Sequence, residues 1–210
     1  MHFINSILAL FIVLLYQISI KNDHLRDLRE FWSYINGSEN FTIKFMDETI
    51  KSSLLILPNV EACKKGSKYL IVIISRTESF SIRNAIRDTW LNSKNANILR
   101  NGFIVAYFLV GIKYDDSTIM MKIIDESMKY NDLIVTSLTD TYDTLTFKVY
   151  TAMYFKQAYC KYVRYYIKVD DDVVIDLDRL DQQANSFSNL AHIYGAIRYN
   201  DRVIRRRMDK

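Results

Sequence analysis

The chain of 210 residues has few of the residues that mark flexible or low-complexity proteins. It contains one proline and five glycines, and half of its residues are hydrophobic. Disordered segments are rich in polar residues and poor in apolar ones, so this composition excludes a largely disordered chain. No internal repeat is visible either. The length and the apolar content suffice for one domain with its own hydrophobic core.

The chain also lacks positive charge spread along its length. The net charge is +4, and residues 196–210 account for all of it. A nucleic-acid-binding domain carries its basic side chains over a face of the fold. We therefore expect no nucleic-acid partner and interpret the basic tail as a solvated chain end.

Cysteine is scarce, since only Cys63 and Cys160 occur. Two cysteines form one disulfide in an oxidising compartment or stay as buried thiols in a reducing one. The sequence leaves both possibilities open.

An apolar segment at residues 3–20 is the only stretch that suits a membrane. At about 1.5 Å per residue a helix of this length spans about 27 Å, close to the thickness of a bilayer core. Gln17 and Ile18 make a poor cleavage site, so we favour an uncleaved signal anchor, with residues 1–2 as a short cytoplasmic end. A cleaved signal peptide is the alternative.

Residues 21–66 are polar and mixed, and we expect a lumenal stem there, followed by the folded domain at residues 67–210. Two sequons, Asn36-Gly37-Ser38 and Asn40-Phe41-Thr42, lie in this segment. They predict lumenal N-glycosylation at Asn36 and Asn40.

From residue 68 onward, strand patterns alternate with helix patterns. Apolar, β-branched runs predict strands at residues 69–74, 103–110, 132–138, 165–169 and 191–197. Helical patterns lie at residues 81–91, 117–129, 144–159 and 177–187, and the third is apolar on most sides, so we expect it to be buried. The alternation predicts an α/β fold with a mostly parallel sheet. Ligands bind beyond the carboxyl ends of such strands, so polar residues there are site candidates.

Three aspartates, Asp170, Asp171 and Asp172, directly follow the strand at residues 165–169. Adjacent carboxylates repel one another, and a hard divalent cation such as Mn²⁺ or Mg²⁺ relieves that repulsion. Residues i and i+2 of an extended segment point the same way, so we expect Asp170 and Asp172 to face one ion. The alternative is a solvated acidic turn.

Two arginines, Arg83 and Arg87, lie four residues apart and therefore on one face of a helix that begins at the same edge. Guanidiniums there suit a diphosphate or an acidic neighbour, and ion-pair partners or surface charges are the alternative roles.

Asp140 follows the third predicted strand, and Asp143, a few residues on, suits a helix cap. Lys148 lies in the first turns of the next helix, where it pairs with a carboxylate or phosphate or extends to solvent.

Together these segments resemble the β-1,3-galactosyltransferase family, which includes β-1,3-N-acetylglucosaminyltransferases and relatives of the Fringe enzymes. The matching blocks are Arg83-Asn-Ala-Ile-Arg-Asp-Thr-Trp90, Phe108-Leu-Val-Gly111, Tyr130-Asn-Asp-Leu-Ile134, Asp140-Thr-Tyr142 with Leu145-Thr-Phe-Lys148, and Lys168-Val-Asp-Asp-Asp-Val-Val174. The resemblance implies a nucleotide-sugar-binding fold of the GT-A type and a single-pass type II anchor in the Golgi membrane. It also implies a UDP-sugar donor, a glycan or glycoconjugate acceptor, and a Mn²⁺-dependent inverting transfer of galactose or N-acetylglucosamine in β-1,3 linkage.

The same resemblance assigns roles to the site residues. Asp172 is the expected direct metal ligand, and Asp171 is expected near the sugar or ribose. Arg83, Arg87 and Asp140 are expected near the donor site or supporting it, and we assign them to donor binding together with Asp170 and Asp171.

The resemblance also implies a C-terminal part of the fold beyond Lys210, since family members continue for roughly another half-domain. That part carries the base that takes the proton of the acceptor hydroxyl, so no catalytic residue is assigned in this chain. One alternative is a truncated, inactive homologue that binds only the donor or a partner. The other is a phosphatase similar to haloacid dehalogenases, with Asp170 as nucleophile and Asp172 as acid/base.

Overall fold

The computed structural model describes residues 39–45, 47–64, 66–186 and 193. Its strands are β1 (Glu39–Phe45), β2 (Glu48–Ile56), β3 (Tyr69–Ile74), β4 (Ile104–Ile112), β5 (Leu133–Thr139) and β6 (Tyr165–Asp170). Its helices are α2 (Glu61–Lys64), α3 (Phe80–Asp88), α4 (Asn97–Arg100), α5 (Ser117–Tyr130), α6 (Leu145–Tyr159) and α7 (Leu177–Ala184). The anchor at residues 3–20, the sequon at Asn36 and the strand at residues 191–197 lie outside the described residues.

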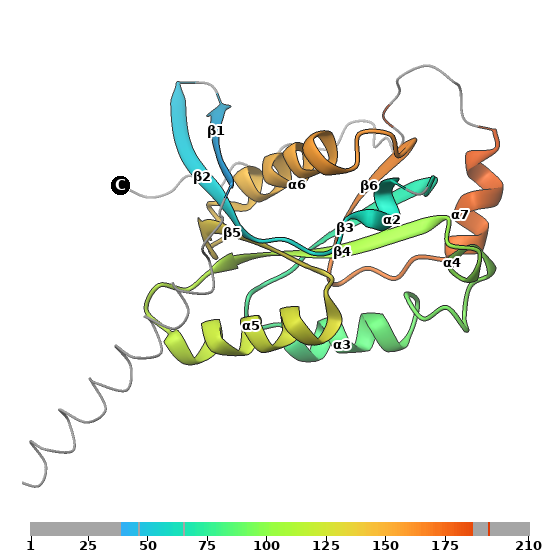
Figure 1. Cartoon of the computed structure of the whole chain (residues 1–210), viewed down its shortest axis with the longest axis horizontal. Coiled ribbons are helices and arrows are strands. Elements are labelled where there is room, and N and C mark those ends of the chain that lie inside the picture. Colours follow the sequence, from blue (N-terminus) through green and yellow to red (C-terminus); the bar gives the residue numbers. More distant parts are fainter. Residues whose placement is uncertain (1–38, 46, 65, 187–192, 194–210) are drawn as a thin grey trace, which may run out of the picture.

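The strands form one sheet in the order β1-β2-β5-β4-β3-β6 (Figure 1). β3 pairs in parallel with both β4 and β6, and β4 pairs in parallel with β5. The expected α/β fold with a mostly parallel sheet is confirmed and is consistent with the GT-A type. One strand differs from expectation, because β4 does not stop before Gly111 but runs through it to Ile112.

Helices cover both faces of the sheet, with α3 and α5 on one side and α6 on the other (Figure 1). Every residue of β3 is buried, as its continuous apolar run predicts. Alternate side chains of β3 enter the two core clusters, Tyr69, Ile71 and Ile73 on the α3 and α5 side and Leu70, Val72 and Ile74 on the α6 side.

The strand order reverses direction between β3 and β6. From β3 the chain moves outward to β4 and β5, and then returns across the sheet to place β6 on the other side of β3. In open α/β sheets such a reversal leaves a crevice beyond the carboxyl ends of the two strands, and ligands bind in it. The ends of β3 and β6 are therefore the place where a site is expected.

The expectation of a buried helix at residues 144–159 is wrong. α6 buries one stripe, made by Lys148, Thr151, Ala152 and Phe155. These residues follow the helical spacing i, i+3, i+4 and i+7, so they lie on one face. The outer face exposes Tyr150 and Met153, the latter by 53%.

The boundary expected at residue 67 is also wrong for the described part of the preceding segment. β1 and β2 form an antiparallel hairpin, and β2 pairs with β5, so both strands belong to the sheet. Ile43 and Leu54 are each 1% exposed and lie in the core cluster beneath α6. Asn40, the second sequon, is exposed on β1, and its Oδ1 accepts a hydrogen bond of 2.6 Å from Ser53 Oγ.

A disulfide joins Cys63 at α2 to Cys160, which follows α6. Their Cα atoms are 5.0 Å apart, and the cysteines are 97 residues apart in the sequence. Of the two states that the sequence left open, the structure therefore has the disulfide. Among the helices of the described residues, none combines the length and the apolar character that a membrane crossing requires.

Candidate functional site

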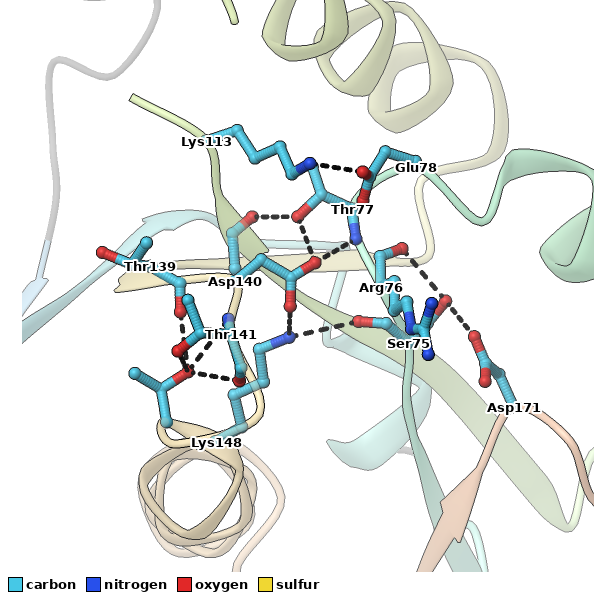
Figure 2. A network of polar contacts seen from close by, with 12 residues as sticks. Ser75, Arg76, Thr77, Glu78, Lys113, Thr139, Asp140, Thr141, Lys148 and Asp171 are labelled. Carbon is cyan, nitrogen blue, oxygen red and sulfur yellow. Dashed lines mark hydrogen bonds and ion pairs between the residues drawn. The ribbon is translucent and has the colours of Figure 1, made fainter. Parts of the chain in front are cut away.

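The aspartate triplet lies at the point where the strand order reverses. Ile74 and Asp170 are partners in the β3–β6 register, so Ser75 and Asp171 come next on the two strands. Ser75 Oγ donates to Asp171 Oδ2 at 2.8 Å (Figure 2). The end of β3 and the middle residue of the triplet are thereby joined through side chains.

The three carboxylates have different surroundings. Asp170 Oδ1 accepts a hydrogen bond of 2.5 Å from Lys168 Nζ, and 49% of the Asp170 side chain is exposed. Asp172 is exposed, and it has no hydrogen bond or ion pair with the other described residues. Asp171 has Oδ2 bound to Ser75.

Asp170, Asp171 and Asp172 are the residues of this site that could hold a divalent cation. Oxygen ligands suit Mg²⁺ and Mn²⁺, and Mg²⁺ is commonly held by one or two carboxylates together with water and substrate phosphates. Within the described ranges, no group of three or more His, Cys, Asp or Glu side chains could hold a metal ion. Asp171 and Asp172 lie in a turn in which the Val173 N–H donates to the Asp170 carbonyl at 3.3 Å, so the extended geometry expected to point Asp170 and Asp172 the same way is not present.

Arg83 lies behind this site and not in it. Its side chain is fully buried, and it pairs with Glu126 of α5 at 2.6 Å. Nη1 donates to the carbonyl of Arg76 at 2.6 Å and to Ser75 Oγ at 3.2 Å, and Nη2 also donates to the carbonyl of Thr77 at 3.1 Å. With the Nε bond to Glu126, all five N–H groups of the guanidinium have partners. In this arrangement Arg83 has an acidic neighbour and supports the loop at residues 75–77, which is one of the roles that the sequence left open.

Arg87 is likewise an ion-pair residue. It forms two hydrogen bonds to Asp132, of 2.7 and 2.8 Å, and an ion pair of 2.8 Å with Glu126. Its guanidinium also lies 3.9 Å from the centre of the Tyr130 ring. Burial alone lowers the pKa of Arg87, but the hydrogen bonds and charges of Asp132 and Glu126 outweigh it and raise the pKa. The ion-pair alternative is the one that the structure shows.

Asp140 also has contacts that support the loop at residues 75–77. Oδ2 accepts hydrogen bonds from the backbone N–H and the hydroxyl of Thr77, and Oδ1 pairs with Lys148 Nζ (Figure 2). Burial alone raises the pKa of Asp140, but the charge and hydrogen bond of Lys148 and the two bonds from Thr77 outweigh it and lower the pKa. Lys148 therefore pairs with a carboxylate and does not extend to solvent. Asp143 is exposed, and Thr144 occupies the cap position of α6.

Two buried ion pairs thus hold residues 75–77 from opposite faces of the sheet. Arg83 and Glu126 come from α3 and α5, and Lys148 comes from α6 to pair with Asp140. Arg83 reaches the carbonyls of Arg76 and Thr77, while Lys148 Nζ donates to the carbonyl of Ser75 at 3.3 Å (Figure 2). The loop that faces the triplet is therefore held by side chains of both α3 and α6.

Gly111 is required beside this loop because two backbone segments meet there. A Cβ at this position would lie 2.6 Å from the carbonyl oxygen of Leu138. Thr77 Oγ1 also lies 3.1 Å from the Gly111 carbonyl oxygen, so the loop, β4 and the end of β5 are packed together.

Sequence reasoning missed four residues of the site, which are Ser75, Thr77, Glu126 and Asp132. Ser75 and Thr77 carry a usable signal, because they are polar residues that directly follow a buried strand. Glu126 carries a weaker one, since it lies three residues after the buried Ile123 and therefore near the apolar face of its helix.

Comparison with known proteins supports one family. The model of the Galactosyltransferase family matches residues 81–210. A protein named beta-1,3-galactosyltransferase bre-2 from Caenorhabditis elegans is 32% identical over 146 residues, which cover 70% of this chain and 40% of that protein. Human beta-1,3-galactosyltransferase 1 is 32% identical over 119 residues, or 56% of this chain and 35% of its own length. Human beta-1,3-galactosyltransferase 2 is 31% identical over 127 residues, or 60% of this chain and 29% of its own length.

The chain thus spans less than half the length of these curated relatives. The matched residues include α3 with both arginines, Asp140 and the aspartate triplet. This chain belongs to the Galactosyltransferase family.

Proposed function

We propose that the protein binds a UDP-sugar at the carboxyl ends of β3 and β6 and transfers its hexose to a glycan or glycoconjugate acceptor. The hexose is galactose or N-acetylglucosamine, and the product has a β-1,3 linkage formed with inversion. Family membership and the names of the relatives support this class of reaction. The observation that carries the proposal is the aspartate triplet at the strand reversal, tied to β3 by the bond of 2.8 Å between Ser75 and Asp171.

The residues at the two strand ends bind different parts of the donor complex. Asp172 and Asp170 would hold Mn²⁺ or Mg²⁺, and that ion supplies positive charge to the diphosphate as it leaves. Asp170 can exchange its pair with Lys168 for the ion because both side chains are partly exposed, and ion pairs near the surface contribute little stability. Asp171 accepts a hydrogen bond from the sugar or ribose of the donor. Arg83, Arg87 and Asp140 keep the loop at residues 75–77 in place.

We also propose that the protein works in the lumen of the Golgi as a type II membrane protein. The disulfide between Cys63 and Cys160 supports an oxidising compartment. The exposure of Asn40 on the edge strand β1 supports glycosylation at that sequon.

The test is calorimetric titration of the full chain with UDP, with and without Mn²⁺. The whole chain is needed because β1 and β2 are part of the sheet. We expect binding that depends on Mn²⁺ and that Asp172→Ala weakens at least about tenfold, as loss of a charged ligand should. Asp125→Ala, which removes an exposed aspartate of α5, is the matched control and should leave binding unchanged. Equal binding by the unchanged protein and Asp172→Ala would sink the proposal.

Turnover is a separate measurement from binding. Release of UDP from UDP-galactose and UDP-N-acetylglucosamine, with a glycan acceptor present, identifies the donor. Mn²⁺-dependent binding without turnover of either donor would support the alternative of an inactive homologue. Membership of a transferase family argues against the phosphatase alternative.

A further inference from the structure

We infer that Ser75 is a positioning residue that fixes which oxygen of Asp171 faces the donor. The inference rests on the proposed donor site and adds to it a residue on the neighbouring strand. Ser75 forms no hydrogen bond with the proposed metal ligands Asp170 and Asp172 among the described residues. It is also buried, with 2% of its surface exposed. It acts through the hydrogen bond to Asp171 Oδ2.

The direction of that hydrogen bond follows from the neighbours of the hydroxyl. Arg83 Nη1 donates to Ser75 Oγ at 3.2 Å, so the oxygen is used as an acceptor. The single hydroxyl hydrogen then goes to Asp171 Oδ2 at 2.8 Å or to the Arg76 carbonyl at 3.3 Å. Bonds to an ionised acceptor are shorter and stronger, so the hydrogen points to Asp171. The Ser75 hydroxyl therefore accepts from the buried Arg83 and donates to Asp171, the middle aspartate of the triplet.

The position of the hydroxyl is fixed by the backbone on which it sits. The N–H of Ser75 donates to the carbonyl of Leu109 at 3.0 Å, and its carbonyl accepts from Lys148 Nζ at 3.3 Å. β4 and α6 therefore both hold Ser75. Because the Ser75 hydroxyl is held in place beforehand, little free energy is spent on reorganising it when a ligand binds.

The consequence is a division between the two oxygens of Asp171. Oδ2 is bound to Ser75, which leaves Oδ1 for the donor. Without the Ser75 hydroxyl the carboxylate of Asp171 rotates, because the described residues give it no other hydrogen bond. Removing the hydroxyl should leave the fold intact, because Arg83 Nη1 keeps its bond of 2.6 Å to the Arg76 carbonyl.

The test compares UDP binding by the full chain and Ser75→Ala in the presence of Mn²⁺. We expect Ser75→Ala to bind about tenfold more weakly, as loss of a hydrogen bond to a charged group should. Ser75→Thr keeps the hydroxyl and should retain most of the affinity. Ser67→Ala is the matched control, because Ser67 is a buried serine at the opposite end of the same strand, with its hydroxyl on the Ala62 carbonyl at 2.9 Å. Its affinity should equal that of the unchanged protein.

A double substitution separates positioning from a general structural effect. If Ser75 acts through Asp171, then Ser75→Ala in an Asp171→Ala background should cause no further loss of UDP affinity. Additive losses would overturn the inference, as would unchanged binding by Ser75→Ala alone, while both results would leave the proposed function standing. Absence of Mn²⁺-dependent UDP binding in the unchanged protein would instead overturn the proposed function and this inference with it.

Discussion

Arg83 Nη2 lies 2.6 Å from Glu126 Oε2, and the two side chains are 0% and 6% exposed. Arg87 joins the same carboxylate at 2.8 Å, so one glutamate serves two guanidiniums beneath the sheet. Buried charges are costly to desolvate and stabilise a fold only when every partner is present. The cluster therefore links α3 to α5 as a unit, and through Arg83 it also holds the loop that faces the aspartate triplet.

Glu126→Gln should lower the free energy of unfolding by about 3–5 kcal/mol, because it leaves buried guanidiniums without their shared carboxylate. Urea unfolding followed by circular dichroism measures the loss. Asp125→Asn, on the exposed side of the same helix, should change stability by no more than about 0.5 kcal/mol. A loss for Glu126→Gln as small as that of the control would mean that the cluster does not form.

The Asp140–Lys148 pair predicts how stability depends on pH. The pKa of Asp140 is lowered in the fold, so its contribution is fully present at neutral pH. It is lost as the pH falls from about 5 towards the lowered pKa, because the folded protein must then take up a proton. Asp140→Asn should cost about 3 kcal/mol at pH 7 and should make the acid limb of the stability profile less steep.

The profile is measured by urea unfolding at several pH values between about 3 and 7. Asp143→Asn removes a nearby exposed aspartate and should reproduce the profile of the unchanged protein. Parallel profiles for Asp140→Asn and the unchanged protein would show that Asp140 is not the titrating group.

The strands and the longer helices between residues 69 and 184 could be predicted because burial and sequence pattern agree there, whereas the four-residue helix α4 was missed. β3, buried on both faces, is an unbroken apolar run, and its site residues directly follow it. The hairpin of β1 and β2 was missed because exposed polar residues interrupt it, and its place in the sheet depends on pairing with β5, far along the chain. The sequence left the roles of Arg83, Arg87 and Asp140 open between alternatives, because the choice depends on partners from other elements. Sequence spacing places two arginines on one helix face, but only the packing of α3 against α5 shows that Glu126 meets them.

The disulfide between Cys63 and Cys160 should be present in protein made in an oxidising compartment. It closes a long loop, since its cysteines are 97 positions apart in the sequence, and it joins α2 to the end of α6. Replacing both cysteines with alanine should cost about 2–4 kcal/mol, chiefly by freeing the unfolded chain. Peptide mapping without reduction checks the bond, and two cysteines that alkylate readily in the native protein would contradict it. A reducing agent should destabilise the unchanged protein but not the double variant.

Gly111→Ala tests the close approach between β4 and the end of β5. The added Cβ would lie 2.6 Å from the Leu138 carbonyl oxygen, and backbone cannot move aside as a flexible side chain can. We expect a cost of about 3 kcal/mol. Asp140 should be displaced with it, since its N–H bonds the Ile112 carbonyl at 3.0 Å. Amide exchange at Asp140 should therefore become faster, and Mn²⁺-dependent UDP binding should weaken.

Gly102→Ala is the control, because Gly102 has a φ of +71° but open space around it. It should cost about 1–2 kcal/mol from the backbone alone and leave exchange at Asp140 unchanged. If both variants affect Asp140 alike, the contact between Gly111 and Leu138 is not what positions it.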